Sequence, residues 1–123
     1  MSLTHKENKW FPKDAFEVKE QSILQEADKI VKGDRQADYG DTVANFKHIA
    51  NIASAIRQKQ FTAEDCCVVL MAVKLAREQF KHKRDNLVDL AGYTEILNQI
   101  KEFETLVQTT IDGANVLYKE AKK

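Results

Sequence analysis

The stretch that most constrains the fold is 62–80, because it reads as a helix with apolar side chains on every side. Residues 66–73 are apolar without interruption, and the whole stretch contains neither proline nor glycine. Thr62 followed by Asp65 is a capping pattern that begins a helix. A helix that is apolar all round is surrounded, either by its own domain or by a partner. We therefore expect a central helix in an all-α domain of four main helices.

Apolar residues at helical spacing also predict the helices that precede this stretch. Ser22 can cap a first helix, which we expect to end at Gly33. A second helix is expected over residues 42–59, with its apolar side chains on one face. Residues 33–41 lie between these helices and lack helical periodicity, so we expect a loop there.

The last helix is expected to begin near Asp85 and to continue towards the C-terminus, with a break at residues 112–113 as the one interruption to consider. An apolar stripe runs along it at alternating steps of mostly three and four residues, as in coiled coils. Its positions are 96, 100, 103, 107, 110 or 111, 114, and 117 or 118. A single small domain hardly needs so long a stripe, so we expect a homo-oligomer.

The size and composition are those of one compact helical domain. The 123 residues include one proline and four glycines, with 43% hydrophobic and 31% charged residues. We expect a single helical domain at 21–123, preceded by an N-terminal extension at 1–20. Positive and negative side chains number 19 each, so the chain as a whole has no electrostatic attraction to nucleic acids or anionic membranes.

The cysteines and the hydropathy of the chain bear on its compartment. Cys66 and Cys67 are adjacent in the expected central helix, where they cannot bridge each other, and they favour a reducing compartment. No apolar run reaches the roughly 18 residues of a membrane span, and the N-terminus lacks the apolar core of a secretory signal. We therefore expect a cytoplasmic protein without a membrane span.

Charged residues on the central helix and on the helix after it form the strongest candidate site. Lys74 and Arg77 lie one turn apart on the first helix, and Asp85, Asp89 and Tyr93 form one stripe of the second. An antiparallel pair of helices would bring these groups within reach of one another. As a binding site, the two carboxylates would hold Mg²⁺ while the cations meet the phosphates of a ligand. The alternative is structural: Asp85 stabilises the start of its helix, and Asp89 pairs with Lys74 or Arg77.

The expected loop carries a second group of candidate binding residues, Arg35, Asp38 and Tyr39. Gly40 would let the backbone turn over a ligand, with Tyr39 as a stacking platform and Arg35 adding positive potential for phosphate. In the structural alternative, Gly40 supplies a positive φ angle and the Tyr39 ring lies under the loop. Both alternatives stay open at this point.

These motifs occur in an order that resembles a family of small phage and prophage proteins of unassigned function. The chain is also similar to the phage nucleotide-modification-associated helical domains, and the resemblance covers about residues 23–100. It rests on a DYG turn at 38–40, a K-x-x-R helix at 74–77 and a D-x-x-x-D-x-x-x-Y helix at 85–93. The resemblance implies an all-helical phage-type protein connected with nucleotides, and the family has no settled activity.

The chain resembles, more distantly, the MazG-like all-α nucleoside triphosphate pyrophosphohydrolases. That resemblance implies a helical oligomer whose last metal-binding helix corresponds to residues 85–93. Those enzymes carry acidic metal ligands on two helices, whereas this chain has Lys74 and Arg77 in the interior of the first. Nucleotide binding without hydrolysis therefore fits these residues as well as metal-assisted pyrophosphate cleavage does.

Two functional hypotheses follow from the sequence. In the first, the protein is a phage-type nucleotide-binding protein, in which the cations and the tyrosines named above contact the ligand and the two aspartates hold Mg²⁺. In the second, it is a non-catalytic helical interaction protein that acts through its C-terminal helix. The sequence leaves open whether the protein is an enzyme.

Overall fold

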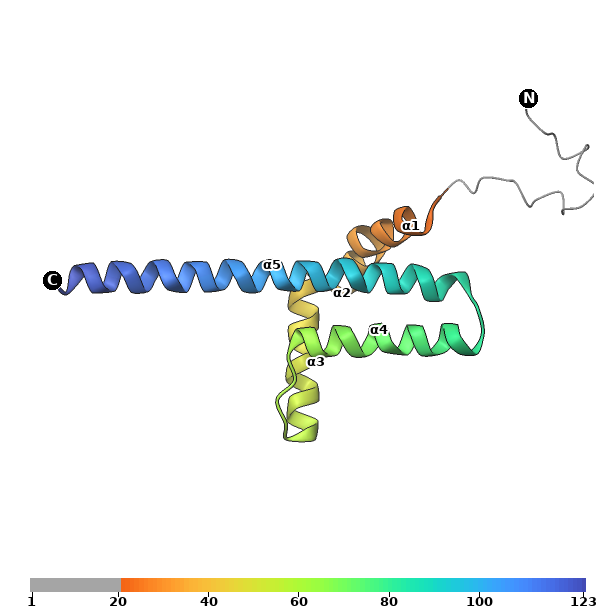
Figure 1. Ribbon diagram of the computed structural model, residues 1–123, viewed down its shortest axis with the longest axis horizontal. Coiled ribbons are helices and arrows are strands. Elements are labelled where there is room, and N and C mark those ends of the chain that lie inside the picture. Colours follow the sequence, from red (N-terminus) through yellow and green to blue (C-terminus); the bar gives the residue numbers. More distant parts are fainter. Residues whose placement is uncertain (1–20) are drawn as a thin grey trace, which may run out of the picture.

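The computed structural model describes residues 21–123, in which every regular element is a helix (Figure 1). The expected all-α class is therefore confirmed, whereas the expected extension at 1–20 lies outside the described residues. The elements are α1 (Ile23–Lys29), the π-helix η2 (Ile30–Asp34), α2 (Arg35–Tyr39), α3 (Thr42–Arg57), α4 (Ala63–Phe80) and α5 (Arg84–Ala121). Because α1, η2 and α2 follow one another without a gap, the chain forms four helical units. Across residues 21–123, no helix has the length and apolarity needed to cross a membrane.

Side-chain caps fix where three of the helices begin. The Ser22 hydroxyl accepts a hydrogen bond from the Gln25 N–H at 3.1 Å, and the Gln25 side chain accepts one from the Ser22 N–H at 2.9 Å. Thr62 and Asp65 form the same reciprocal pair at the start of α4, with distances of 3.0 and 2.9 Å. The Asp41 carboxylate caps α3. Each cap satisfies N–H groups that the first turn of a helix leaves without a partner.

The loop expected at residues 33–41 is not present, and this prediction was wrong. The first helix continues through Gly33 by widening into the π-helix η2, and α2 follows immediately. A π-turn adds one residue to the helical repeat, so it hides the 3.6-residue period that signals a helix. The helix ends instead at Gly40, whose φ of +76° is open to glycine but costly for other residues.

The core lies where α3 crosses the α4–α5 hairpin. In Figure 1, α4 runs antiparallel to the first half of α5, α3 crosses them at a steep angle, and α1 lies on the other side of α5. The largest fully buried side chains are Phe46, Cys67, Ile96 and Ile100. Burial raises the pKa of the Cys67 thiol to about 11, so Cys67 is a core residue and not a reactive thiolate. Cys67 therefore has a packing role in the core.

Helix α5 is continuous, so the interruption considered at residues 112–113 does not occur. Its last part, residues 101–123, is exposed throughout and extends well beyond the other helices (Figure 1).

Helix α4 is covered on one side only. Within the described chain, its outer face leaves apolar side chains such as Val69 and Phe80 exposed by 56% and 92%. Of the two alternatives for this apolar helix, the described part of its own domain covers one side only, and a covering partner stays a prediction.

Candidate functional site

The α4–α5 hairpin brings four of the candidate residues to one groove. Lys74 and Arg77 lie in the last turns of α4, and Asp85 and Asp89 lie in the first turns of α5. Because the helices are antiparallel and joined by a short turn, these two ends lie side by side. The groove has a cavity volume of about 670 Å³, in the range of small-molecule sites. Its lining residues are Lys74, Ala76, Arg77, Phe80, Lys81, Lys83, Asp85, Asn86 and Asp89.

One ion pair spans the groove. The ammonium group of Lys74 lies 2.7 Å from a carboxylate oxygen of Asp89, and the Lys74 side chain is only 16% exposed. This contact is one of the two pairings that the structural alternative allowed. The other two candidates, Arg77 and Asp85, are exposed, and neither forms an ion pair within residues 21–123. The groove therefore contains one structural pair and further charges that face solvent.

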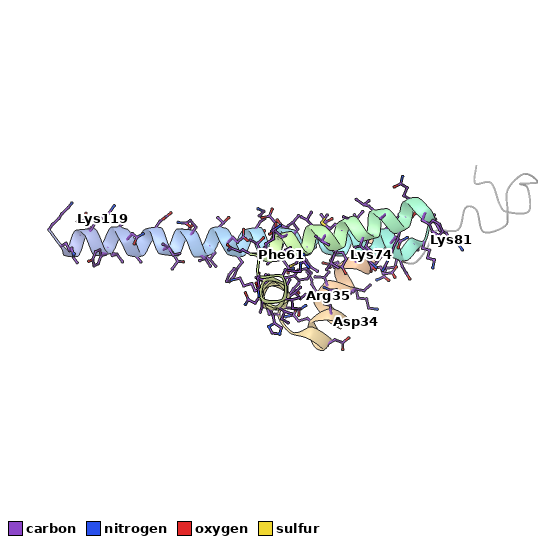
Figure 2. All side chains as sticks on the ribbon, turned by 90° about the horizontal axis from the view of Figure 1, so that it is seen from below. Asp34, Arg35, Phe61, Lys74, Lys81 and Lys119 are labelled. Carbon is purple, nitrogen blue, oxygen red and sulfur yellow. The ribbon has the colours of Figure 1, made fainter. Side chains whose placement is uncertain are left out.

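The charge of the groove is positive. Lys81 and Lys83 in the hairpin turn join Lys74 and Arg77 at its wall, against two carboxylates. Figure 2 shows Lys74 and Lys81 towards the hairpin end of the molecule, opposite the end that carries Lys119. Four cations around one cavity create a local potential that attracts phosphate, although the chain as a whole is neutral.

Glu78 orders the turn that carries these lysines. Its carboxylate contacts the His82 ring and accepts hydrogen bonds from the Lys83 N–H and the Asn86 amide, both at 3.3 Å. Partial burial opposes ionisation of Glu78, but these hydrogen bonds prevail and lower the pKa of its carboxyl group. This cluster was not predicted from the sequence. The i, i+4 spacing of Glu78 and His82 was the available signal.

Arg84 belongs to the same basic turn but serves another purpose. Its guanidinium pairs with Glu26 of α1 and donates a hydrogen bond to the Gln21 carbonyl at 3.0 Å. These contacts attach the start of α1 to the start of α5. Arg84 does not line the groove.

Arg35 and Tyr93 lie at a different, much smaller cavity. The Arg35 guanidinium lies 5.4 Å from the centre of the Tyr93 ring and 5.9 Å from that of Phe46. The two rings meet edge to face, 6.4 Å between centres. This cavity, which Asp89 also borders, measures about 30 Å³ and has room for about one water molecule. Cation–π contacts to two rings show that Arg35 packs α2 onto the core.

The remaining candidates of the expected loop do not join the groove. Asp38 is exposed on α2 and is not among the groove's lining residues. Tyr39 is the last residue of α2, and its side chain lies outside the described part of the structure. The binding surface expected over the DYG turn is therefore not the place where the charged candidates gather.

The predicted magnesium site consists of Asp85 and Asp89 alone. Nowhere in residues 21–123 do three or more histidine, cysteine or acidic side chains form a group that could hold a metal ion. The Asp89 carboxylate is also engaged by Lys74 at 2.7 Å, so a cation at this place would compete with an ammonium group. The donor set does not fit a resident metal, and a magnesium ion that arrives with phosphates stays a prediction.

Comparison with known proteins agrees with the expected phage relationship. Residues 22–101 match the family described as Domain of unknown function (DUF6378). The Gene 55 protein of Mycobacterium phage L5 is 37% identical over 82 residues, which are 65% of this chain and 53% of the relative. The Gene 55 protein of Mycobacterium phage D29 is 34% identical over 83 residues, 67% of this chain and 55% of the relative.

These matches cover part of this chain and part of each relative. The chain spans about half the length of the curated relatives that it matches. The family match includes α1 through the first half of α5, and with them the groove, and stops near Lys101, where α5 leaves the core. No solved structure matches the chain.

Proposed function

The chain belongs to the DUF6378 family, and on that premise we propose that it binds a nucleotide through its phosphates in the groove at the α4–α5 turn. The observation that carries this proposal is the gathering of four cations around one ligand-sized cavity. Among residues 21–123, only one of them, Lys74, is paired with a carboxylate. Phosphate groups are the ligands that such a concentration of positive charge attracts most strongly.

Each group in the groove has a distinct role in this proposal. Arg77 meets the phosphates with its planar fork of donors, and Lys81 and Lys83 add positive charge from the ordered turn. Asp89 holds Lys74 in place across the groove. Phe80, which is 92% exposed at the end of α4, offers a flat apolar surface on which a base stacks.

The proposal is limited to binding. Two-metal cleavage of a triphosphate relies on several carboxylates that hold the ions between the attacking and leaving oxygens. The groove provides two carboxylates, and one of them is engaged by Lys74. The distant resemblance to MazG-like enzymes is therefore a reason to assay pyrophosphate release once binding is established.

A thermal-shift screen against nucleoside mono-, di- and triphosphates, with and without Mg²⁺, tests this proposal. A ligand at a hundred times its Kd should stabilise the fold by about 2.7 kcal/mol, which corresponds to several degrees for a domain of this size. Arg77→Ala should abolish the shift while leaving the unliganded protein as stable as the wild type, because Arg77 is exposed and forms no ion pair in the described chain.

Arg57→Ala is the matched control. Arg57 is an exposed arginine in the last turn of its helix, as Arg77 is, but it does not line the groove. The control should shift with the nucleotide like the wild type. A flat screen, or a shift that survives Arg77→Ala, would show that the groove does not bind nucleotides.

A further inference from the structure

Within residues 21–123, the end of α5 has little support from the rest of the chain: Lys101 pairs with Glu64 of α4, and the Lys47 ammonium lies over the ring of Phe103. Residues 101–123 extend for about 35 Å at the usual rise of a helix, and all of them are exposed. Most of the stability of helices in proteins comes from the packing of an apolar face rather than from intrinsic propensity. The question is therefore what stabilises the helical conformation of residues 101–123.

The composition of this segment does not favour a helix. Besides Gly113, it contains six β-branched residues, which lose side-chain freedom in a helix. These residues are Thr105, Val107, Thr109, Thr110, Ile111 and Val116. Three of the threonines also donate hydrogen bonds to the carbonyl four residues earlier, a pattern that slightly destabilises helices. Intrinsic propensity therefore adds little to the stability of this segment, whereas a surface that covers its apolar stripe would stabilise it.

The apolar stripe of α5 indicates which face a partner would cover. Its first members, Ile96 and Ile100, are buried in the core, with 1% exposure each. The same stripe continues beyond the core through Phe103, Val107 and Leu117, with exposures of 37%, 39% and 72%. A stripe that begins in a packed core and runs on at coiled-coil spacing is suited to pack against another helix.

The distribution of charge along residues 101–123 indicates which helix could pack against this stripe. Residues 101–112 contain three carboxylates and one lysine, whereas residues 113–123 contain three lysines and one carboxylate. Two copies of the segment side by side in the same direction would place like charges opposite each other. Two copies in opposite directions place the acidic half of each against the basic half of the other, so the segment is complementary to itself.

We propose that two copies of this chain associate through residues 101–123 of α5 as an antiparallel helix pair. The spacing of the stripe sets the register, with Val107 facing Leu117 of the second copy and Thr110 facing its Ala114. The same register places Glu104 within one helical turn of Lys122 of the second copy, twice in each dimer. Such an interface is isologous and closes on two copies.

Sedimentation of the full chain over a range of concentrations tests the dimer. Val107→Asp should raise the dissociation constant of the dimer roughly 100-fold, because two unpaired carboxylates would enter the apolar seam. Val116→Asp is the matched control, since Val116 lies nine residues further on and hence on the opposite face of the helix. It should leave the dimer unchanged.

Charge reversal tests the direction of the two helices. Glu104→Lys alone and Lys122→Glu alone should each raise the dissociation constant about threefold to tenfold, and an equimolar mixture of the two variants should regain the wild-type value. Single variants that dimerise as well as the wild type would overturn the antiparallel arrangement. A chain that is monomeric at all concentrations, or a dimer that Val107→Asp leaves intact, would overturn the proposal as a whole.

Discussion

The ion pair between Lys74 and Asp89 should contribute more to the free energy of unfolding than the ion pair between Lys101 and Glu64, which also joins α4 to α5. Replacing Lys74 by methionine keeps the apolar stem of the side chain and leaves the Asp89 carboxylate without its partner. The Lys74 side chain is 16% exposed and that of Asp89 is 37% exposed, so the loss lies well below the cost of stranding a fully buried charge. We expect Lys74→Met to lower the free energy of unfolding by roughly 1–2 kcal/mol.

A double-mutant cycle separates the pair from the individual side chains. Lys74→Met, Asp89→Asn and the double variant should give a coupling energy of about 1 kcal/mol in urea denaturation at fixed protein concentration. The internal control is the pair of Lys101 with Glu64, which joins the same helices at 2.6 Å but leaves the lysine 53% exposed. Its coupling should be smaller, because water screens an exposed pair. An equal or larger coupling for the control pair would refute the argument from burial.

Two further predictions concern the turn between α4 and α5 and the turn between α2 and α3. At pH 7 the wild type should be more stable than Glu78→Gln, and urea denaturation should show this advantage shrinking as the pH falls below about 4.5. The reason is that the pKa of Glu78 is lowered in the fold, so the contribution of its carboxylate is lost on protonation. Gly40→Ala should lower the free energy of unfolding by roughly 1–3 kcal/mol, because Gly40 has a φ of +76°. Gly33→Ala is the control for this change. It should not destabilise the protein in the same assay, because the φ of Gly33 is not positive and an added Cβ would meet nothing within 4 Å.

The sequence predicted most of the fold because helix signals are local. The caps at Ser22 and Thr62 and the helical periods of α3, α4 and α5 depend on neighbours within a few residues, and all are found in the structure. The π-helix was not predicted, because its extra residue breaks the period by which a helix is recognised. For this reason residues 33–41 were expected to form a loop.

The candidate site was predicted in part. The spacing of the charged residues on two adjacent helices was enough to place Lys74, Arg77, Asp85 and Asp89 together. The spacing of residues in the sequence does not tell which cation forms an ion pair with a given carboxylate, because that pairing depends on the rotation and offset of the two packed helices. For the same reason the sequence did not predict that the Arg35 guanidinium lies against two aromatic rings.

The π-helix has a consequence for how the chain tolerates changes in length. A π-turn is equivalent to an α-helix that has gained one residue, so deletion of one residue within 30–34 would restore an ordinary α-helix. The deletion would leave the residues after it in nearly the same orientation, because the wider turn already absorbs the extra residue. Arg35 would keep its place against the rings of Phe46 and Tyr93, and Gly40 would still end the helix. A deletion in the regular turns of α1 would instead rotate everything after it by about 100° around the helix axis, so the chain should tolerate the loss of one residue best within 30–34.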